Sequence, residues 1–359
     1  MTHRSQPTRL RAPRFALLAA AAGLLAAGSA AAATLTLNET GSSLLYPLFN
    51  LWVPAYTKAH PGVQINTAST GSGTGIAQSI EGLVQFGASD AYLSDAQMKK
   101  NPEMLNIPVA ISSQMINYNL PGLNNVHLKL NGTTVAGMYD GRIRYWDNAA
   151  LKQLNPGVNL PHHLIVTVHR TDGSGDTFMF SQFLSFTDKT WAQKVGYGTS
   201  VNWPAVPGAI GANGNPGMVS ALRNAPYSIA YVGVSFKNQT EKDGLGEAML
   251  QNRAGRFVMI NEKTVPAAAA AMVPKTPRDE RISMIYAPGA ESYPIINYEY
   301  VMVKRDQPDA QQAAAIKQFL TWAVSPQGGN ALGFLKQVNF LPLPASARAL
   351  TLAQIGQIR

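Results

Sequence analysis

Short apolar runs recur along most of the chain and predict the strands of a sheet. Strands are expected where apolar residues run together or alternate with polar residues. The clearest run, 164–168, continues to Arg170 and stops there abruptly. Other segments of this kind occupy 34–37, 63–65, 86–90, 107–111, 115–119, 227–235, 257–260 and 295–303.

Between these runs, apolar residues return every three or four positions, which is the spacing of one face of a helix. The strongest example covers 44–56 and has Leu44, Leu45, Leu48, Phe49, Trp52, Val53 and Tyr56 on one face. Further helices are predicted at 76–84, 135–139, 149–154, 176–184, 265–273 and 310–324. Strands that alternate with helices predict an α/β fold with mainly parallel sheets. The stretch 196–217, with nine Gly or Pro among its 22 residues, predicts a long irregular loop.

Three predicted strands run into a Gly/Ser loop that precedes a predicted helix. The loops are 39–43, 70–75 and 172–175, and the last one begins two positions after Arg170. Backbone N–H groups at a helix N-terminus and an arginine fork together favour a small oxyanion. A plain capped helix, with Ser174 or Asp176 as the cap, is the alternative for the third loop. The 70–75 loop matches neither the P-loop nor the dinucleotide fingerprint.

The N-terminus predicts a secretory signal peptide over 1–33. Four arginines precede an alanine-rich apolar stretch, and 31–33 are three alanines that suit cleavage before Thr34. A retained membrane anchor is the alternative, but alanine has a weak tendency to enter the bilayer. We therefore expect a periplasmic or secreted protein, with a cleaved signal peptide.

Composition limits the chemistry that remains. The 359 residues have room for about two domains, and no cysteine is present, which excludes disulfides, thiol catalysis, zinc–thiolate sites and a lipid-anchored cysteine. Without 1–33 the net charge is +5, a mild value that does not argue for nucleic acid. His162 and His163 are adjacent and lack an obvious third ligand, so no metal or other cofactor is expected.

The loops, taken in order, resemble the phosphate-binding proteins of ABC phosphate importers, the PstS family. The resemblance covers essentially all of 34–359 and is strongest to the mycobacterial type, although that type carries a lipidated cysteine and this chain has none. It is carried by Glu39-Thr-Gly-Ser-Ser-Leu-Leu-Tyr-Pro-Leu-Phe49, Gly71-Ser-Gly-Thr-Gly75, Gly87-Ala-Ser-Asp-Ala-Tyr-Leu-Ser94, Gly141-Arg-Ile-Arg-Tyr-Trp-Asp147, His169-Arg-Thr-Asp-Gly-Ser-Gly-Asp-Thr177 and Pro294-Ile-Ile-Asn-Tyr-Glu-Tyr300.

The resemblance implies the α/β fold of a type II periplasmic binding protein, in which two α/β lobes are joined by crossing hinge strands. The crossings would lie near 113–118 and 294–298. Lobe 1 would then be discontinuous, with 34–116 plus 294–359, and lobe 2 would be 117–293. The expected partners are inorganic phosphate and the membrane permease subunits of an ABC importer, with the protein a monomer within that complex, not an enzyme, and free of nucleic acid.

The resemblance also implies which residues bind phosphate. One loop would offer backbone N–H groups and a hydroxyl, a second loop another hydroxyl, and Asp90 would accept a proton borne by the ligand. The residues are Ser42, Ser43 and Leu44, with the hydroxyl on Ser43, then Ser72, Asp90, Arg170, Ser174, Gly175 and Asp176. In many relatives the position of Asp176 is threonine, and an acid there is a feature of the mycobacterial type.

Several alternatives stay open at the level of sequence. Asp90 could simply cap the helix that follows it. Asp176 could accept a second ligand proton, so that the site favours H₂PO₄⁻, or it could cap its helix without touching the ligand. One other class of function is a secreted phosphate- or acyl-ester hydrolase, with Ser174 or Ser72 as nucleophile; His169 lies close to Ser174 in the sequence. Another is a binder of a different oxyanion, such as sulfate or molybdate.

Overall fold

The computed structural model describes residues 1–3 and 34–359, so the predicted signal peptide lies almost entirely outside the described residues. Its strands are β1 (Leu35–Gly41), β2 (Val63–Ser69), β3 (Phe86–Ser89), β4 (Met104–Asn119), β5 (Lys129–Leu130), β6 (Val166–Arg170), β7 (Ile210–Ala212), β8 (Ser228–Gly233), β9 (Gly246–Glu247), β10 (Met249–Gln251), β11 (Phe257–Val258) and β12 (Ile296–Lys304). Its α-helices are α1 (Tyr46–Ala59), α2 (Ser72–Glu81), α3 (Asp95–Lys100), α4 (Gly132–Tyr139), α5 (Ala149–Leu154), α6 (Gly175–Thr187), α7 (Lys189–Lys194), α8 (Gly214–Asn224), α9 (Lys237–Lys242), α10 (Thr264–Met272), α11 (Ala310–Ala323), α12 (Leu332–Leu335) and α13 (Ala345–Gly356).

One nine-stranded sheet runs through the body formed by 34–359. Its strand order is β2-β1-β3-β12-β4-β8-β6-β7, and β9 also pairs with β4. The outer strands pair in parallel, β2 with β1 and β1 with β3 at one end, and β8 with β6 and β6 with β7 at the other. The central strands β12 and β4 pair antiparallel with all their neighbours. The prediction of mainly parallel sheets was therefore wrong for the centre, because apolar runs do not show strand direction.

Strand β4 connects the two parts of the sheet. Its first part, from Met104 to Ser113, pairs with β12, and its last part, from Gln114 to Asn119, pairs with β8. The sequence predicted two separate extended segments here, but they form one strand of 16 residues. The polar residues between the two predicted segments, Ser112, Ser113 and Gln114, are buried at the point where β4 changes partner.

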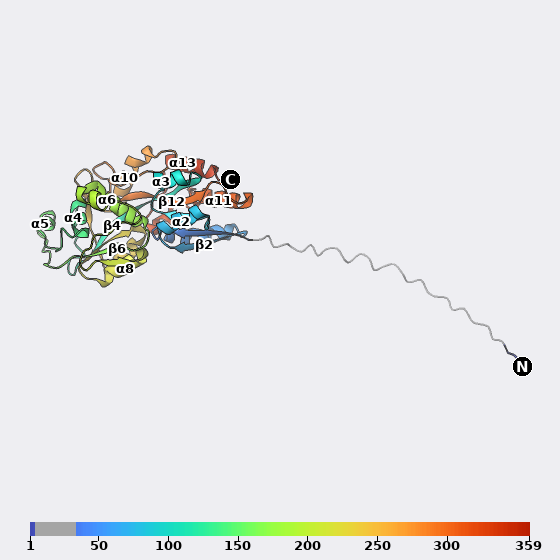
Figure 1. Cartoon of the computed structure of the whole chain (residues 1–359), viewed down its shortest axis with the longest axis horizontal. Coiled ribbons are helices and arrows are strands. Elements are labelled where there is room, and N and C mark those ends of the chain that lie inside the picture. The colour runs from blue at the N-terminus through green and yellow to red at the C-terminus, as the bar shows by residue number, and fades with distance from the viewer. Residues whose placement is uncertain (4–33) are drawn as a thin grey trace. The chain divides into compact units, whose positions relative to one another are not determined.

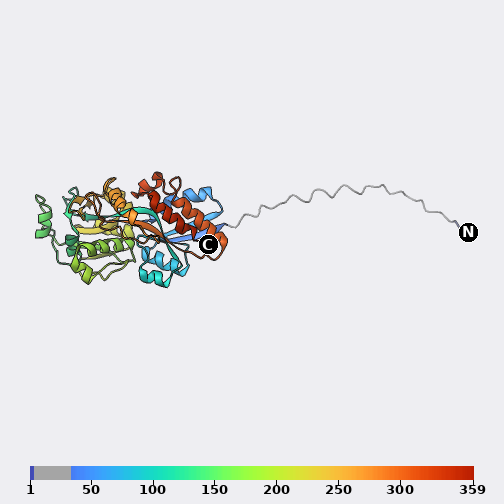
Figure 2. The same cartoon turned by 90° about the horizontal axis from the view of Figure 1, so that it is seen from above.

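Segments from both ends of the chain share one core. The ring of Phe319 in α11 lies 5.2 Å from Phe86 of β3 and 6.4 Å from Trp52 of α1, measured between ring centroids. Figure 1 shows α2 and β2 near the red helices α11 and α13, while α4 and α5 lie at the opposite end of this body. Figure 2, seen from above, shows the same grouping. The lobe boundaries at 116/117 and 293/294 stay a prediction.

Two other parts of the chain differ from their predictions. The stretch 196–217 is not one irregular loop, because it contains β7 and the start of α8. Helix α3 was not predicted, although Ser94 and Gln97 form a capping box at its start. Among the described residues, no helix is both long and apolar enough to cross a membrane.

Candidate functional site

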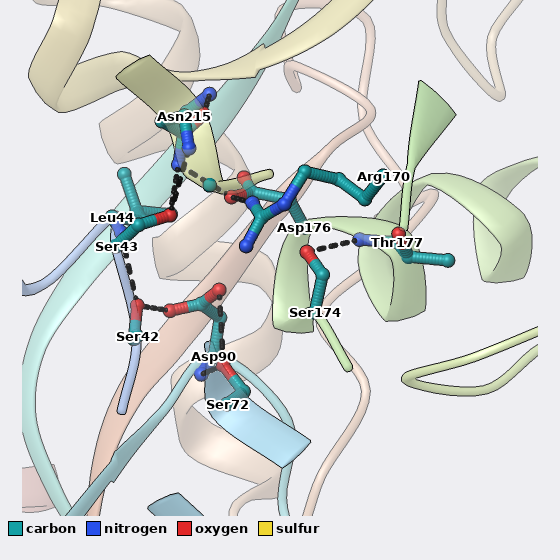
Figure 3. Close-up of polar contacts among 12 residues, drawn as sticks. Ser42, Ser43, Leu44, Ser72, Asp90, Arg170, Ser174, Asp176, Thr177 and Asn215 are labelled. Atoms are coloured by element: carbon teal, nitrogen blue, oxygen red, sulfur yellow. Dashed lines mark hydrogen bonds and ion pairs between the residues drawn. The ribbon is translucent and has the colours of Figure 1, made fainter. Parts of the chain in front are cut away.

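The site lies where several parallel strands end. Strands β1, β3 and β6 end at Gly41, Ser89 and Arg170, and each continues into a polar loop. Figure 3 shows Ser42, which follows β1, and Ser72, at the start of α2 after β2, beside Asp90, which follows β3, with Arg170, Ser174 and Asp176 facing them. The three Gly/Ser loops predicted from the sequence therefore converge with the segment after β3, and the nine predicted site residues lie in or beside these four segments.

Asp90 is buried and accepts hydrogen bonds from two loops. The hydroxyl of Ser42 donates to its Oδ1, and the hydroxyl of Ser72 lies 3.4 Å from its Oδ2. The backbone N–H of Asp90 in turn donates to Ser72 Oγ, at 3.2 Å. Burial, followed by the negative charge of Asp176, raises the pKa of Asp90 to about 7. Asp90 does not cap α3, because Ser94 does.

After β1, two of the three backbone N–H groups that were predicted to bind phosphate have partners within the protein. The backbone N–H of Ser42 donates to the carbonyl oxygen of Ala88, at 3.0 Å, and that of Leu44 donates to Ser42 Oγ, at 3.1 Å. Ser43 Oγ accepts from both the backbone N–H and the side-chain amide of Asn215, each at 3.0 Å. The Ser43 hydroxyl hydrogen thus remains free to donate, and phosphate contact by this loop stays a prediction.

Arg170 is buried and held by two carboxylates. Its Nε donates to Asp172 Oδ1 at 2.7 Å, its Nη2 pairs with Asp172 Oδ2, and its Nη1 lies 3.0 Å from Asp176 Oδ2. Of the five N–H bonds of a guanidinium, these contacts use three, so two remain for a ligand. Asp172 was not predicted as a site residue, yet it accepts two of these bonds and holds the Arg170 guanidinium in place.

Helix α6 begins at the site. Ser174 is its N-cap, since Ser174 Oγ accepts from the backbone N–H of Thr177 at 3.1 Å. The N–H groups of Gly175 and Asp176 precede the first hydrogen bond inside the helix and are free to bind an anion. A side chain at Gly175 would collide with Asp90 and Ser72, so the helix can approach Asp90 only with glycine there.

Asp176 neither caps its helix nor lies exposed. Its Oδ1 accepts from Gln114 Nε2 at 3.0 Å, and its Oδ2 accepts from Asn215 Nδ2 at 2.6 Å and from Arg170. Burial raises the pKa of Asp176, and the charge of Arg170 and the two amide donors oppose this shift. Gln114 and Asn215 were not predicted as site residues. Asn215 belongs to the Gly/Pro-rich stretch that was interpreted as an irregular loop.

The arrangement does not support a hydrolytic nucleophile. The His169 ring packs on Trp203, with centroids 4.9 Å apart, and burial lowers the pKa of His169. The Ser174 and Ser72 side chains instead bond to the backbone of Thr177 and to Asp90. His162 and His163 stack on different tyrosines, and the described residues contain no group of three metal-ligating side chains.

Comparison with known proteins shows which family the sequence is similar to. Residues 26–327 match the model of the PBP superfamily domain. The phosphate-binding protein PstS of Methanocaldococcus jannaschii is 32% identical over 81% of this chain and 79% of the relative. PstS of Xylella fastidiosa is 34% identical over 86% of this chain and 81% of the relative. PstS 3 of Mycobacterium leprae is 28% identical over 88% of this chain and 84% of the relative.

Solved structures show the same fold at lower identity. A high-affinity periplasmic phosphate-binding protein, solved with phosphate at pH 8.5, has a TM-score of 0.70 at 21% identity and covers 89% of this chain and 93% of its own. A putative substrate-binding protein of a phosphate ABC transporter from Clostridium perfringens, also with bound phosphate, has a TM-score of 0.60 at 16% identity. The match covers 86% of this chain and 100% of that protein.

Proposed function

This chain belongs to the PstS phosphate-binding proteins of the PBP superfamily, and from this membership and its site we propose that it binds inorganic phosphate and delivers it to an ABC-type phosphate importer. Its fold is that of a type II periplasmic binding protein, as the phosphate-binding structures of the same fold indicate. One observation carries the choice of ligand: a buried carboxylate, Asp90, faces an arginine fork and a helix N-terminus.

That combination suits an anion that still carries a proton. Arg170, the first turn of α6 and the Ser43 hydroxyl supply donors for oxygen atoms. Asp90 can only accept when it is ionised, so it needs a donor on the ligand. Phosphate near neutral pH provides one O–H, whereas sulfate provides none. Sites that depend on such a hydrogen bond discriminate by factors of about 10⁴.

The nine residues predicted as phosphate contacts remain the proposed set, with changes of role. Ser42 acts through its hydroxyl on Asp90, because its N–H is bonded to Ala88. Asp172 and Asn215 are added as residues that hold Arg170, Ser43 and Asp176 in place. The proposed residues of the phosphate site are Ser42, Ser43, Leu44, Ser72, Asp90, Arg170, Ser174, Gly175 and Asp176, among which Ser42 acts through Asp90 and Leu44 donates its N–H to Ser42 Oγ.

We further propose that the protein is not an enzyme and that it works as a monomeric periplasmic or secreted receptor. The relatives include phosphate-binding proteins, the His169 ring packs on Trp203, and the two candidate serines bond to Asp90 and to the backbone of Thr177. The permease subunits of the importer are the partners that this role requires. The two lobes, 34–116 plus 294–359 and 117–293, are proposed to enclose the ligand.

A calorimetric titration of the purified protein with phosphate and with sulfate tests the function. We expect one phosphate per chain and sulfate binding weaker by about 10⁴. Equal affinity for the two anions, or no binding of phosphate, would overturn the proposal. A colorimetric phosphatase and esterase assay on the same sample should show no turnover, and catalytic turnover would favour the hydrolase alternative.

A further inference from the structure

A second carboxyl group, Glu299 of β12, lies next to Asp90. Strand β12 runs antiparallel to β3, with Tyr300 opposite Ser89, so the next pair in this register is Glu299 opposite Asp90. Side chains opposed in this way have Cβ atoms about 4.5–5.5 Å apart. The amide of Asn297, also on β12, donates to the carbonyl oxygen of Asp90 at 2.6 Å and fixes the two segments together.

Glu299 has few partners for an ionised carboxylate. It has no exposed surface, and Ser112 on β4 donates to its Oε1. Its Oε2 is buried and has no hydrogen-bond partner in the part of the chain that the structure describes. The charged groups that face it are Asp90 and Asp176, both acidic, and within the described residues it forms no ion pair.

The surroundings decide which of the two acids holds a proton. Two carboxylates this close in a buried site are not both ionised, so one proton is shared between them. Asp90 accepts from two serine hydroxyls and feels the charge of Arg170, which favour its ionised form. Glu299 has one hydroxyl donor, and burial and the charge of Asp90 raise its pKa well above the ordinary value. The proton therefore belongs to Glu299.

We propose that Glu299 is a positioning residue of the phosphate site: as a neutral acid it donates a hydrogen bond to Asp90 and keeps Asp90 ionised as the acceptor of the ligand's proton. This role rests on the proposed function of the site. Without the donor, Asp90 would hold its own proton more tightly. A neutral Asp90 can donate to a bare oxygen, and so it no longer rejects sulfate.

Two substitutions separate this role from a purely structural one. Glu299→Gln keeps an N–H donor for Asp90 and a carbonyl acceptor for Ser112. Glu299→Met keeps the length of the side chain and removes both. A matched control is Glu39→Gln, because Glu39 is another buried acid with a raised pKa, on β1, and within the described residues its carboxyl oxygens have no hydrogen-bond partner.

The test is calorimetric titration of the four proteins with phosphate and sulfate between pH 6 and pH 9. Wild type, Glu299→Gln and Glu39→Gln should keep the same phosphate-to-sulfate affinity ratio at pH 8. In Glu299→Met the ratio should fall at least about tenfold at pH 8 and recover toward pH 9, as Asp90 loses its proton. An unchanged ratio in Glu299→Met, or equal losses in Met and Gln variants at every pH, would overturn the role.

Infrared spectroscopy gives a second readout that needs only the conservative variant. The C=O stretch of one protonated carboxyl group should be present in the wild-type phosphate complex at pH 8 and missing in Glu299→Gln. Identical spectra would show that Glu299 is ionised, which overturns the inference even where Glu299→Met does not fold. If wild type binds no phosphate in the titration, the proposed function fails, and this inference fails with it.

Discussion

The backbone N–H of Gly73 donates to the carbonyl oxygen of Gly173 at 2.8 Å. This bond joins the first turn of α2 to the loop between β6 and α6, 100 positions further along the chain. No side chain takes part, and the two backbones approach so closely that each glycine leaves no room for a Cβ on the other. A Cβ at Gly73 would lie 2.9 Å from the Cα of Gly173, and a Cβ at Gly173 would lie 3.0 Å from the Cα of Gly73.

Gly73→Ala should therefore weaken phosphate binding without unfolding the protein. Overpacking of this kind costs about 1–3 kcal/mol, which corresponds to an affinity loss of about fivefold to about 150-fold if the contact forms with the ligand bound. Calorimetric titration measures it, and Gly62→Ala is the matched control, because a Cβ at Gly62 meets nothing within 4 Å. Equal affinities for the two variants would show that the contact plays no part in binding.

Asp90→Asn should lower the preference for phosphate over sulfate. The amide of asparagine can donate to a bare sulfate oxygen, while an ionised Asp90 cannot. Because the pKa of Asp90 is raised to about 7, wild type should itself lose discrimination as the pH falls below about 7, where Asp90 gains a proton. Titrations at pH 6 and pH 8 check both statements. Discrimination in the variant equal to that of wild type at pH 8 contradicts this role for Asp90.

Arg170→Lys should weaken phosphate binding by about tenfold to a hundredfold, since hydrogen bonds to charged groups contribute about 1.5–3 kcal/mol. A lysine keeps the charge but cannot bond Asp172, Asp176 and the ligand together. Far-UV circular dichroism should remain that of wild type, with a lower melting temperature, because buried acids lose a partner. Asp172→Asn should produce a smaller loss of affinity by loosening the same guanidinium. Wild-type affinity in Arg170→Lys would place Arg170 outside the ligand contacts.

Asp176→Thr should leave the pH profile of phosphate affinity unchanged above pH 7, whereas below pH 7 the loss of the Asp176 charge lowers the pKa of Asp90 and moves the effect of Asp90 protonation to lower pH. Gln114, Asn215 and Arg170 already donate to the Asp176 carboxylate, so it needs no second proton from the ligand. The structure thus speaks against selective binding of H₂PO₄⁻ through Asp176. Titrating both proteins from pH 5.5 to pH 8.5 decides the matter. If affinity falls through pH 7 in wild type alone, Asp176 accepts a ligand proton after all.

Glu39→Gln should stabilise the protein at neutral pH. Both carboxyl oxygens of Glu39 are buried without a hydrogen-bond partner among residues 1–3 and 34–359, and burial raises the pKa of Glu39 well above 4.5. An acid with a raised pKa in the folded state stabilises the fold most below its unfolded pKa and loses this contribution as pH rises. Differential scanning calorimetry should show a melting temperature about 2 °C higher for the variant at pH 8 and a smaller difference at pH 4. A variant that melts below wild type at pH 8 contradicts this account.

The sequence predicted the local part of the site well. Each Gly/Ser loop follows a strand and precedes a helix, and these units depend on neighbouring residues only. It could not predict partners brought in from a distance: Asn215 reaches Ser43 across 172 positions, and Ser112 reaches Glu299 across 187. The direction of the strands could not be predicted from the sequence either, because a buried strand has the same apolar pattern whether its neighbours are parallel or antiparallel.

Strand β4 sets the distance between the groups that bond two acids of the site, Glu299 and Asp176. Ser112 bonds Glu299, the neighbour of Asp90, and Gln114 bonds Asp176. These two residues are separated by one position, so they point to the same face of the strand, about 6.6–6.8 Å apart along it. The spacing between the supports of both acids is thus a backbone dimension and does not depend on rotamers. Deleting or inserting a single residue at Ser113 would turn one support to the opposite face, so this strand tolerates substitutions in the site far better than any change in its length.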